Sequence, residues 1–408
     1  MTKPKKMTLY SIISIIIIVI VFLVGSCVKC SPTFVFRILT HFDSSVMDYS
    51  FFPSRQISKG DKAYIYTYDI DKSLPDLEIK YITSHGNNET KSLEDFVVSM
   101  DSSSFIIVKD DKIVYEQYAN GYDRESVNTT FSAAKSIDSL LIGKAIEDGY
   151  INNENQSIAS YISEFTGTNM EQVTIKDLLT MRSDISYEES GILWFRDDAY
   201  TYWMPDLRKL ALEHRTLTDQ YNGKFHYNNY HPLLLGIILE RSTGMSVSEY
   251  FEKSIWEKIG SEYNASWSLD SASSQFEKME SGINFRSIDF IKIGSMVLHG
   301  GYWNNQQIIS KSWIENSIAQ FPVNESEYED SFLEGRNIGY GYMWYSKPSS
   351  AGGLDIIAWG KYNQILYISP KNNVVILRTG LKSGDVNDFS DVLDYIATHV
   401  GQMGAINS

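Results

Sequence analysis

Strand patterns lie at the two ends of the main body of this chain, and helical patterns fill the stretch between them. The apolar runs 105–108 and 113–118 flank a polar turn, which is typical of a β-hairpin. Further strand candidates lie near the C-terminus, at residues 340–345, 354–359, 364–369 and 374–379. Short turns join the last three, which favours an antiparallel meander. This order predicts an α+β fold in which both ends of the body contribute to one antiparallel sheet flanked by helices.

Apolar residues at helical spacing dominate the rest of the body. The first such pattern covers residues 132–148, and Gly149 ends it. Further helical patterns cover residues 175–181, 206–212, 233–240, 247–258, a segment through Ile293 and Val297, and residues 389–400. We interpret residues 151–289 as a mostly helical lobe inserted between the strands. A sheet beside such a lobe leaves a cleft at their boundary.

The N-terminus carries an apolar run long enough to cross a membrane. Three lysines within the first six residues precede an uncharged stretch over residues 9–28, and about 20 apolar residues span the hydrocarbon core of a bilayer. The lysines before the run, against Lys29 alone just after it, favour a cytoplasmic N-terminus and an external body. A cleaved signal peptide, or a lipoprotein signal ending at a lipidated Cys27, remains an alternative. An uncleaved anchor, a cleaved signal peptide and a lipoprotein signal would each place the main body of the chain outside the cytoplasm.

Composition excludes several classes of function. The 408-residue chain is 43% hydrophobic, enough for a folded body, and its net charge of −15 argues against a nucleic-acid partner. The only cysteines, Cys27 and Cys30, lie beside the apolar run, so the body has no disulfide framework or thiolate metal site. His226 and His231 lack a third ligand at fitting spacing, so we expect no metal. We interpret the four acidic residues Glu188, Glu189, Asp197 and Asp198 as a solvated rim and not as an acid-base pair.

Ser132 and Lys135 form a Ser-x-x-Lys pair at the start of the predicted helix 132–148. Positions i and i+3 share a helix face, so the amine can reach the hydroxyl. Serine is a poor nucleophile unless a neighbouring base or cation activates it. Backbone N–H groups at a helix N-terminus also favour developing negative charge. The competing interpretation is a helix-capping serine followed by a solvated lysine.

A second motif lies in the helical lobe, where Tyr227 and Asn229 form Tyr-x-Asn just before an apolar helix. Together with Ser132-x-x-Lys135, this resembles the serine beta-lactamase and penicillin-binding-protein superfamily, most of all the class C beta-lactamase-related serine hydrolases. Residues 177–180, which read Asp-Leu-Leu-Thr, also resemble a segment of that family. The resemblance covers roughly residues 105–400, in matching order and spacing.

The resemblance implies a role for each motif residue. Ser132 would be the nucleophile, and Lys135 would hold its proton or lower its pKa. Tyr227 would exchange protons with the hydroxyl and the leaving group, and Asn229 would orient the substrate or Lys135. Because a tyrosine of pKa about 10 is a poor base near neutral pH, Tyr227 needs a cation nearby, and Lys135 is the obvious one.

The third motif is Ala358-Trp359-Gly360, followed by Lys361. In beta-lactamases and penicillin-binding proteins its first position is typically Lys or His, which helps to bind a carboxylate, so Ala358 argues against beta-lactam or D-Ala-D-Ala cleavage. Family esterases and 6-aminohexanoate-oligomer hydrolases accept other residues there. By the resemblance, the N–H groups of Ser132 and Lys361 would form an oxyanion hole and Gly360 would allow close approach. Trp359 either lines the substrate pocket or packs a sheet face.

The expected layout follows from these patterns. We expect a membrane anchor or signal segment at 1–30, a connector with one or two strands at 31–101, a catalytic domain at 102–400 and a tail at 401–408. The predicted protein is a cofactor-free serine hydrolase that cleaves an ester or amide of a small molecule or short peptide. Alternatives are a beta-lactamase or D,D-peptidase, or a non-catalytic cell-wall-binding protein of the same fold.

Overall fold

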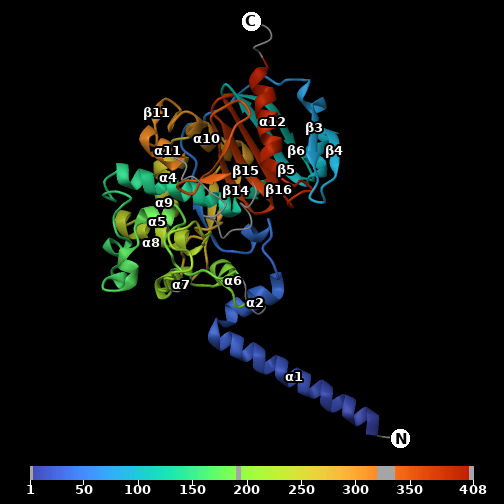
Figure 1. Ribbon diagram of the computed structural model, residues 1–408, viewed down its shortest axis with the longest axis vertical. Helices are drawn as coiled ribbons and strands as arrows, with labels where there is room; N and C mark the ends of the chain where they lie inside the picture. The colour runs from blue at the N-terminus through green and yellow to red at the C-terminus, as the bar shows by residue number, and fades with distance from the viewer. Residues whose placement is uncertain (1–2, 190–193, 319–335, 404–408) are drawn as a thin grey trace.

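One eight-stranded sheet forms the centre of the body in the computed structural model, which describes residues 3–189, 194–318 and 336–403 (Figure 1). Its strand order is β12-β13-β14-β15-β16-β5-β6-β2. The strands are β2 (Thr67–Tyr68), β5 (Ser102–Lys109), β6 (Lys112–Tyr118), β12 (Gly339–Tyr340), β13 (Tyr345–Pro348), β14 (Leu354–Gly360), β15 (Gln364–Ser369) and β16 (Val374–Gly380). All neighbours pair antiparallel except β2, which runs parallel to β6. The predicted antiparallel sheet is confirmed, and the pair β16–β5 joins its two halves.

Helices cover both faces of this sheet. Helix α10 (Ser287–Leu298) packs so closely on one face that a Cβ at Gly294 would lie 2.5 Å from Val375 Cγ1. On the opposite face, α12 (Phe389–Gln402) places the Phe389 ring 4.5 Å from the Arg378 guanidinium. Val375 and Arg378 point to opposite faces because side chains alternate along a strand. The two helices therefore enclose β16, which accounts for its complete burial.

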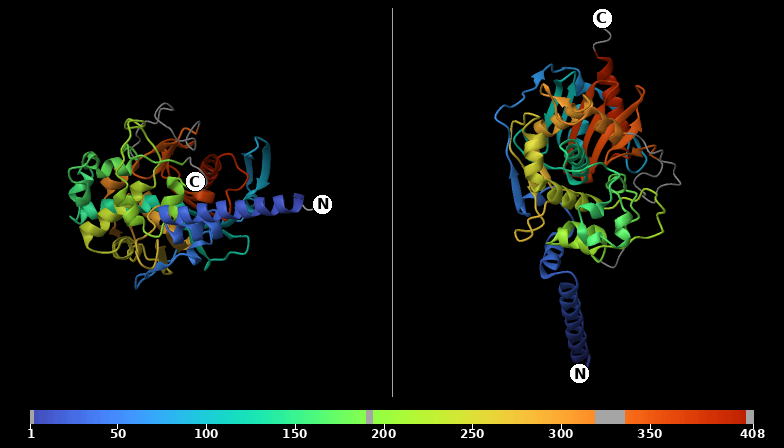
Figure 2. Two further views of the ribbon diagram at one scale, coloured as in Figure 1. Left: turned by 90° about the horizontal axis from the view of Figure 1, so that it is seen from below. Right: turned by 90° about the vertical axis from the view of Figure 1, so that its left-hand side faces the viewer.

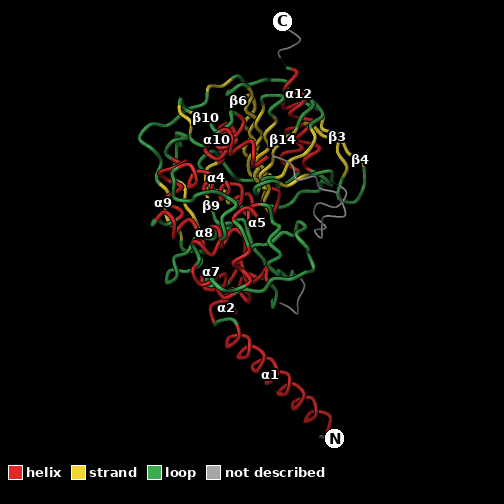
Figure 3. The backbone as a smooth tube through the Cα atoms, turned by 60° about the vertical axis from the view of Figure 1, so that its left-hand side comes forward, coloured by secondary structure: helices red, strands yellow, loops and turns green. Residues whose placement is uncertain are grey.

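The helical lobe lies beside the sheet and is built around a buried pair of helices, α4 (Ala134–Glu147) and α8 (Tyr230–Thr243). A short 3-10 turn, η3 (Phe131–Ala133), precedes α4, so the predicted helix starts with a tighter turn than expected. The other helices of the lobe are α5 (Ile175–Leu179), α6 (Asp197–Trp203), α7 (Leu207–Glu213) and α9 (Val247–Phe251), with 3-10 turns η4 (Ile158–Ser160), η5 (Ser163–Phe165) and η6 (Asn169–Gln172). Helix α9 continues as one π-helical turn, Glu252–Trp256. Figure 3 shows α7 and α8 apart from the main group of strands.

Two strands that the sequence patterns missed lie inside the predicted lobe. They are β8 (Ala265–Ser268) and β9 (Ile283–Arg286), which form a second sheet of order β1-β8-β9-β7 with β1 (Ser54–Ile57) and β7 (Val127–Thr129). The predicted strand 340–345 is also wrong in detail, because Met343 adopts a positive φ of 59° and the chain turns between β12 and β13. Other elements of the described part of the body are β10 (Tyr302–Trp303), β11 (Gln306–Gln307), α11 (Lys311–Ile318) and η9 (Lys361–Asn363).

The segment 31–101 has more structure than the one or two strands expected. It contains α2 (Pro32–His41), α3 (Leu93–Ser99), the 3-10 turns η1 (Asp48–Ser50) and η2 (Leu74–Asp76), strands β1 and β2, and the hairpin β3 (Glu78–Ile82) and β4 (Asn88–Ser92). Ahead of it, α1 (Lys3–Lys29) projects from the body (Figures 1 and 2). Its stretch Tyr10–Lys29 has a mean hydropathy of 3.0 and is long enough to cross a membrane.

Arg378 secures the loop that follows β14. Its guanidinium is fully buried and donates to the carbonyl oxygens of Tyr362, Asn363, Met100 and Lys382 and to Ser102 Oγ. These bonds tie the turn η9 to the start of β5. Carbonyl groups buried without a donor are costly, so this one side chain fixes the position of η9.

We expect Arg378→Lys to lower the free energy of unfolding by about 2–4 kcal/mol, because a lysine can satisfy only part of this set of acceptors. Urea unfolding monitored by circular dichroism measures the effect. Lys382→Ala is the control, since the Lys382 side chain is 74% exposed and its ion pair with Asp101 spans 3.7 Å; it should change stability by no more than about 0.5 kcal/mol. Equal effects of the two substitutions would contradict the role of Arg378.

Candidate active site

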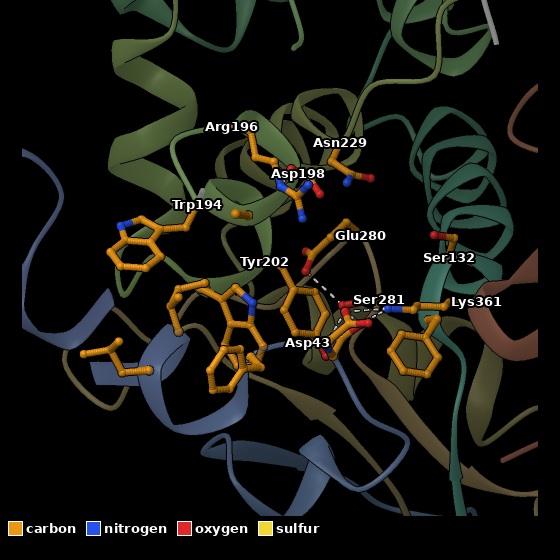
Figure 4. Close-up of a pocket in the computed structure, with 17 residues that line it drawn as sticks. Asp43, Ser132, Trp194, Arg196, Asp198, Tyr202, Asn229, Glu280, Ser281 and Lys361 are labelled. Atoms are coloured by element: carbon orange, nitrogen blue, oxygen red, sulfur yellow. Dashed lines mark hydrogen bonds and ion pairs between the residues drawn. The ribbon is translucent and has the colours of Figure 1, made fainter. Parts of the chain in front are cut away.

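Ser132 lies in the 3-10 turn η3, at the boundary between the sheet and the helical lobe. The preceding residue, Phe131, has a positive φ of 44°, an unfavourable conformation for a residue with a side chain. Its ring packs edge to face against Tyr362 of η9, with centroids 5.5 Å apart. The turn leaves Ser132 half-buried on the wall of a cavity that Asn229 and Glu280 also line, which we call the first cavity (Figure 4). Backbone strain of this kind is concentrated at functional sites.

Lys135 is buried directly behind Ser132. Its side chain is 1% exposed, and Nζ donates to Ser132 Oγ at 3.1 Å and to the Glu280 carbonyl oxygen at 3.0 Å. Burial lowers the pKa of Lys135 to about 8, although the nearby charges of Glu280 and Asp138 raise it. An amine with this pKa is neutral in a substantial fraction of molecules near pH 8, and a neutral amine can accept a proton from a hydroxyl.

Tyr227 reaches the same place from the loop before α8. Its ring centroid lies 4.9 Å from Lys135 Nζ, and the side chain lines a second cavity together with Ser132, Trp359 and Gly360. The structure therefore brings Tyr227 to Ser132 and Lys135 from a part of the sequence more than 90 residues away.

Asn229 faces the first cavity, which Ser132 also lines. Its amide nitrogen donates to the Tyr187 hydroxyl at 2.8 Å and to Thr201 Oγ1 at 3.4 Å, while the buried Oδ1 has no hydrogen-bond partner among the residues that the structure describes. The lobe thus holds the amide at the wall of the first cavity. Its hydrogen bonds go to the lobe and not to Lys135, so of the two predicted roles the contact with substrate fits better.

Gly360 ends strand β14 against the turn η3. A Cβ atom at this position would lie 2.2 Å from the Thr130 carbonyl oxygen and 3.1 Å from the backbone nitrogen of Ser132. Only glycine permits this approach, and the approach places the end of the strand beside Ser132. Two residues earlier, Ala358 is fully buried, so the first position of the predicted third motif carries a small apolar side chain.

Trp359 and Lys361 flank this glycine and differ in what they contact. Trp359 is 5% exposed, lines the second cavity and donates from Nε1 to Asn363 Oδ1 at 2.8 Å, so it both packs the sheet and borders the site. The Lys361 side chain contributes to the cavity wall but turns to the N-terminal segment, where Nζ contacts Asp43 at 2.7 Å and Ser44 Oγ at 2.8 Å. Its ammonium group is therefore committed to that ion pair.

Sequence reasoning missed a cluster of buried charges behind Ser132. Glu280 lines the first cavity, forms a buried 2.7 Å ion pair with Lys278 and accepts a hydrogen bond from Ser281 Oγ at 2.8 Å. Asp138 is fully buried one helical turn after Lys135, and burial raises its pKa well above the usual range. No motif marks these residues. Asp138 lies three positions after Lys135 on α4, and Glu280 reaches Lys135 from the segment between β8 and β9.

The structure also shows where the residues of the predicted acidic rim and the two histidines lie. Glu188 is exposed as expected, but Asp198 lines the first cavity and pairs with Arg196 at 2.9 Å, so the interpretation as a wholly solvated rim is wrong. His226 and His231 contact the Tyr187 carbonyl and the Ser183 hydroxyl, respectively. Among the described residues, no group of three or more His, Cys, Asp and Glu side chains could hold a metal ion.

Comparison with known proteins identifies relatives of this arrangement. The sequence model of the family described as Beta-lactamase matches residues 93–385. A 6-aminohexanoate-dimer hydrolase of Paenarthrobacter ureafaciens is 23% identical over 319 residues, which cover 72% of this chain and 79% of that protein.

Two solved structures share the fold. One is described as a 6-aminohexanoate-dimer hydrolase from Bacillus anthracis, with a TM-score of 0.72, 22% identity and coverage of 88% of this chain and 93% of that one. The other is a D-stereospecific amidohydrolase from Streptomyces sp., with a TM-score of 0.55, 14% identity and coverage of 74% and 95%.

Gly360→Ala tests the close approach of β14 to η3. We expect the added methyl group to force the two segments apart, lowering stability by about 1–3 kcal/mol and slowing the reaction of Ser132 with a fluorophosphonate about 100-fold or more. Gly86→Ala is the control for labelling: its φ of 81° makes alanine strained there, but nothing lies within 4 Å of the added Cβ, so the reaction of Ser132 should keep its rate. Unchanged labelling of Gly360→Ala would show that the contact does not position the serine.

Proposed function

Because the chain belongs to the beta-lactamase family and is a serine hydrolase, we propose that it cleaves an ester or amide bond through an acyl-enzyme on Ser132. The observation that carries the proposal is the 3.1 Å hydrogen bond between Ser132 Oγ and the buried amine of Lys135. A serine hydroxyl beside an amine whose pKa is lowered to about 8 is an activated nucleophile. The alternative interpretation, a helix-capping serine followed by a solvated lysine, does not explain why Lys135 is only 1% exposed.

In the proposed acylation, the neutral Lys135 amine accepts the Ser132 proton as Oγ attacks the substrate carbonyl. The backbone N–H groups of Ser132 and Lys361 stabilise the oxyanion, an effect worth about 3 kcal/mol for each donor. Tyr227, beside Lys135, conveys the proton to the leaving group. Water then attacks the acyl-enzyme with the same groups in reverse order, which releases the acid and restores Ser132.

The third motif favours an esterase or amidase over an enzyme that cleaves beta-lactams or D-Ala-D-Ala peptides. The position that binds the carboxylate in those enzymes is the fully buried Ala358, and the nearby Lys361 ammonium is paired with Asp43. The similarity to a 6-aminohexanoate-dimer hydrolase supports a short amide or ester substrate. A non-catalytic cell-wall protein remains the alternative from another class, but it would not need the Ser132–Lys135 contact.

We also propose that residues 1–30 anchor the protein in a membrane and that residues 102–400 form the catalytic domain outside the cytoplasm. The apolar stretch Tyr10–Lys29, of which only 6% is buried in the protein, and the preceding lysines support this arrangement. Lipidation at Cys27 after cleavage is the alternative. The intact mass of the membrane-extracted protein distinguishes an uncleaved chain from a lipidated one.

Labelling with a fluorophosphonate probe tests the nucleophile. We expect the wild type to gain one probe mass and Ser132→Ala to gain none, since the activated hydroxyl is lost. Ser160→Ala, which removes an exposed serine of the lobe, should label like the wild type. Absence of labelling in the wild type, or equal labelling of Ser132→Ala, would refute the proposal.

The pH dependence of ester hydrolysis tests the role of Lys135. Its pKa is lowered to about 8, so the neutral, proton-accepting form gains population as the pH rises through that value. We expect kcat/KM for an uncharged ester to rise about tenfold per pH unit below pH 8 and to level off above it. A profile that is flat between pH 6 and 9 would show that another group takes the proton.

A further inference from the structure

The first cavity extends from Ser132 to the N-terminal helix α2 and changes character along its length. It has a volume of about 410 Å³. Polar side chains surround the end near Ser132, with Asn229, Glu280, Ser281 and Lys361 among them. The rest of its wall includes the apolar side chains of Ile38, Leu39, Phe42, Trp194, Ala199 and Trp203, together with Tyr202 and the ion-paired Arg196 and Asp198. Figure 4 shows Trp194 at the end of the cavity opposite to Ser132.

Helix α2 is a fixed part of this wall. The buried Arg37 donates to the Trp203 carbonyl oxygen at 2.9 Å and to the Asp270 carbonyl oxygen at 2.6 Å. Phe34, Val35 and Ile38 form a small apolar core with Trp203 of α6. The ion pair between Asp43 and Lys361 ties the residues after α2 to the end of β14. The cavity therefore exists only because the N-terminal segment covers the lobe.

The same wall contacts the helix that is long enough to cross a membrane. Phe22 of α1 packs against Trp194 and Phe195, with ring centroids 5.5 and 6.0 Å apart, and Lys29 Nζ lies 4.6 Å from the Phe195 ring. Phe22 lies in the C-terminal half of the apolar stretch Tyr10–Lys29. Tryptophan and lysine at the end of such a stretch are typical of the membrane–water interface. In an anchored protein, the apolar end of the cavity would lie at the membrane surface.

Exposed apolar side chains connect that surface to the cavity. Leu39 is 45% exposed and Phe42 84% exposed, and both also line the cavity. Val28 of α1 and Phe36 of α2 are also exposed, at 83% and 59%. Exposed apolar side chains grouped in this way mark a site of interaction with a membrane or an apolar ligand.

We propose that the substrate is an amphiphile of the membrane, an ester or amide whose apolar acyl chain enters past Leu39 and Phe42 and occupies the first cavity. The inference rests on the function proposed above and names its substrate class. Tyr227, the proposed proton donor to the leaving group, lines the second cavity, so the polar alcohol or amine occupies that cavity. The acyl group passes to Ser132 Oγ as the carbonyl–heteroatom bond breaks, the alcohol or amine leaves with the proton, and water releases the carboxylic acid.

The experiment compares p-nitrophenyl acetate with p-nitrophenyl octanoate, hydrolysed by the full-length protein in lipid vesicles. The octanoyl chain has six methylene groups more than the acetyl group, and binding transfers them from water into the cavity. We therefore expect kcat/KM to be at least about tenfold higher for the octanoate. Leu39→Ser should remove most of this preference by lowering kcat/KM for the octanoate more than for the acetate. Phe36→Ser is the matched control, since Phe36 is an exposed residue of the same helix that does not line the cavity; it should keep the preference.

Two results would overturn the inference while leaving the proposed function intact. One is active hydrolysis and fluorophosphonate labelling with no preference for the octanoate. The other is an equal loss of preference in Leu39→Ser and Phe36→Ser, which would assign the effect to vesicle binding and not to the cavity. Absence of both hydrolysis and labelling would instead contradict the proposed function itself, and the inference with it.

Discussion

The contact between the end of β14 and the turn η3 holds the site together. Gly360 lies so close to the Thr130 carbonyl oxygen and the Ser132 nitrogen that no side chain fits between them. Through this contact the sheet, assembled from both ends of the body, meets the helical lobe, which carries Tyr227 and Asn229. Arg378 secures the following turn by bonding to the carbonyl groups of Tyr362 and Asn363. The geometry around Ser132 is therefore a property of backbone packing more than of side-chain contacts.

The second constraint is the burial of Lys135. Removing the charged ammonium group from water costs free energy. Hydrogen bonds to Ser132 Oγ and the Glu280 carbonyl oxygen, together with the nearby carboxyl groups, offset this cost only in part. The lowered pKa is the consequence. The chemistry proposed for Ser132 depends on this balance, because a lysine in full contact with water would stay protonated at neutral pH.

Much of the fold could be predicted because the hairpin β5–β6, the meander β14–β16 and helix α4 follow the periods of strands and helices. The motif residues Ser132, Lys135 and Tyr227 could be named from the sequence, and the structure brings them together. Strands β8 and β9 were missed because they are four residues long and carry polar residues such as Ser266 and Asn284. The roles of Asp43 and Glu280 could not be predicted, since they depend on contacts between distant segments. The ion pair of Asp43 with Lys361, for example, spans 318 positions.

In the proposed mechanism, Ser132 carries the acyl group during turnover. Acid quenching during hydrolysis of p-nitrophenyl octanoate, followed by peptide mass spectrometry, would trap this intermediate. We expect a peptide containing Ser132 whose mass is increased by one octanoyl group, and no such peptide in Ser132→Ala. Steady turnover without an acylated peptide, or with the acyl group on another residue, would contradict it.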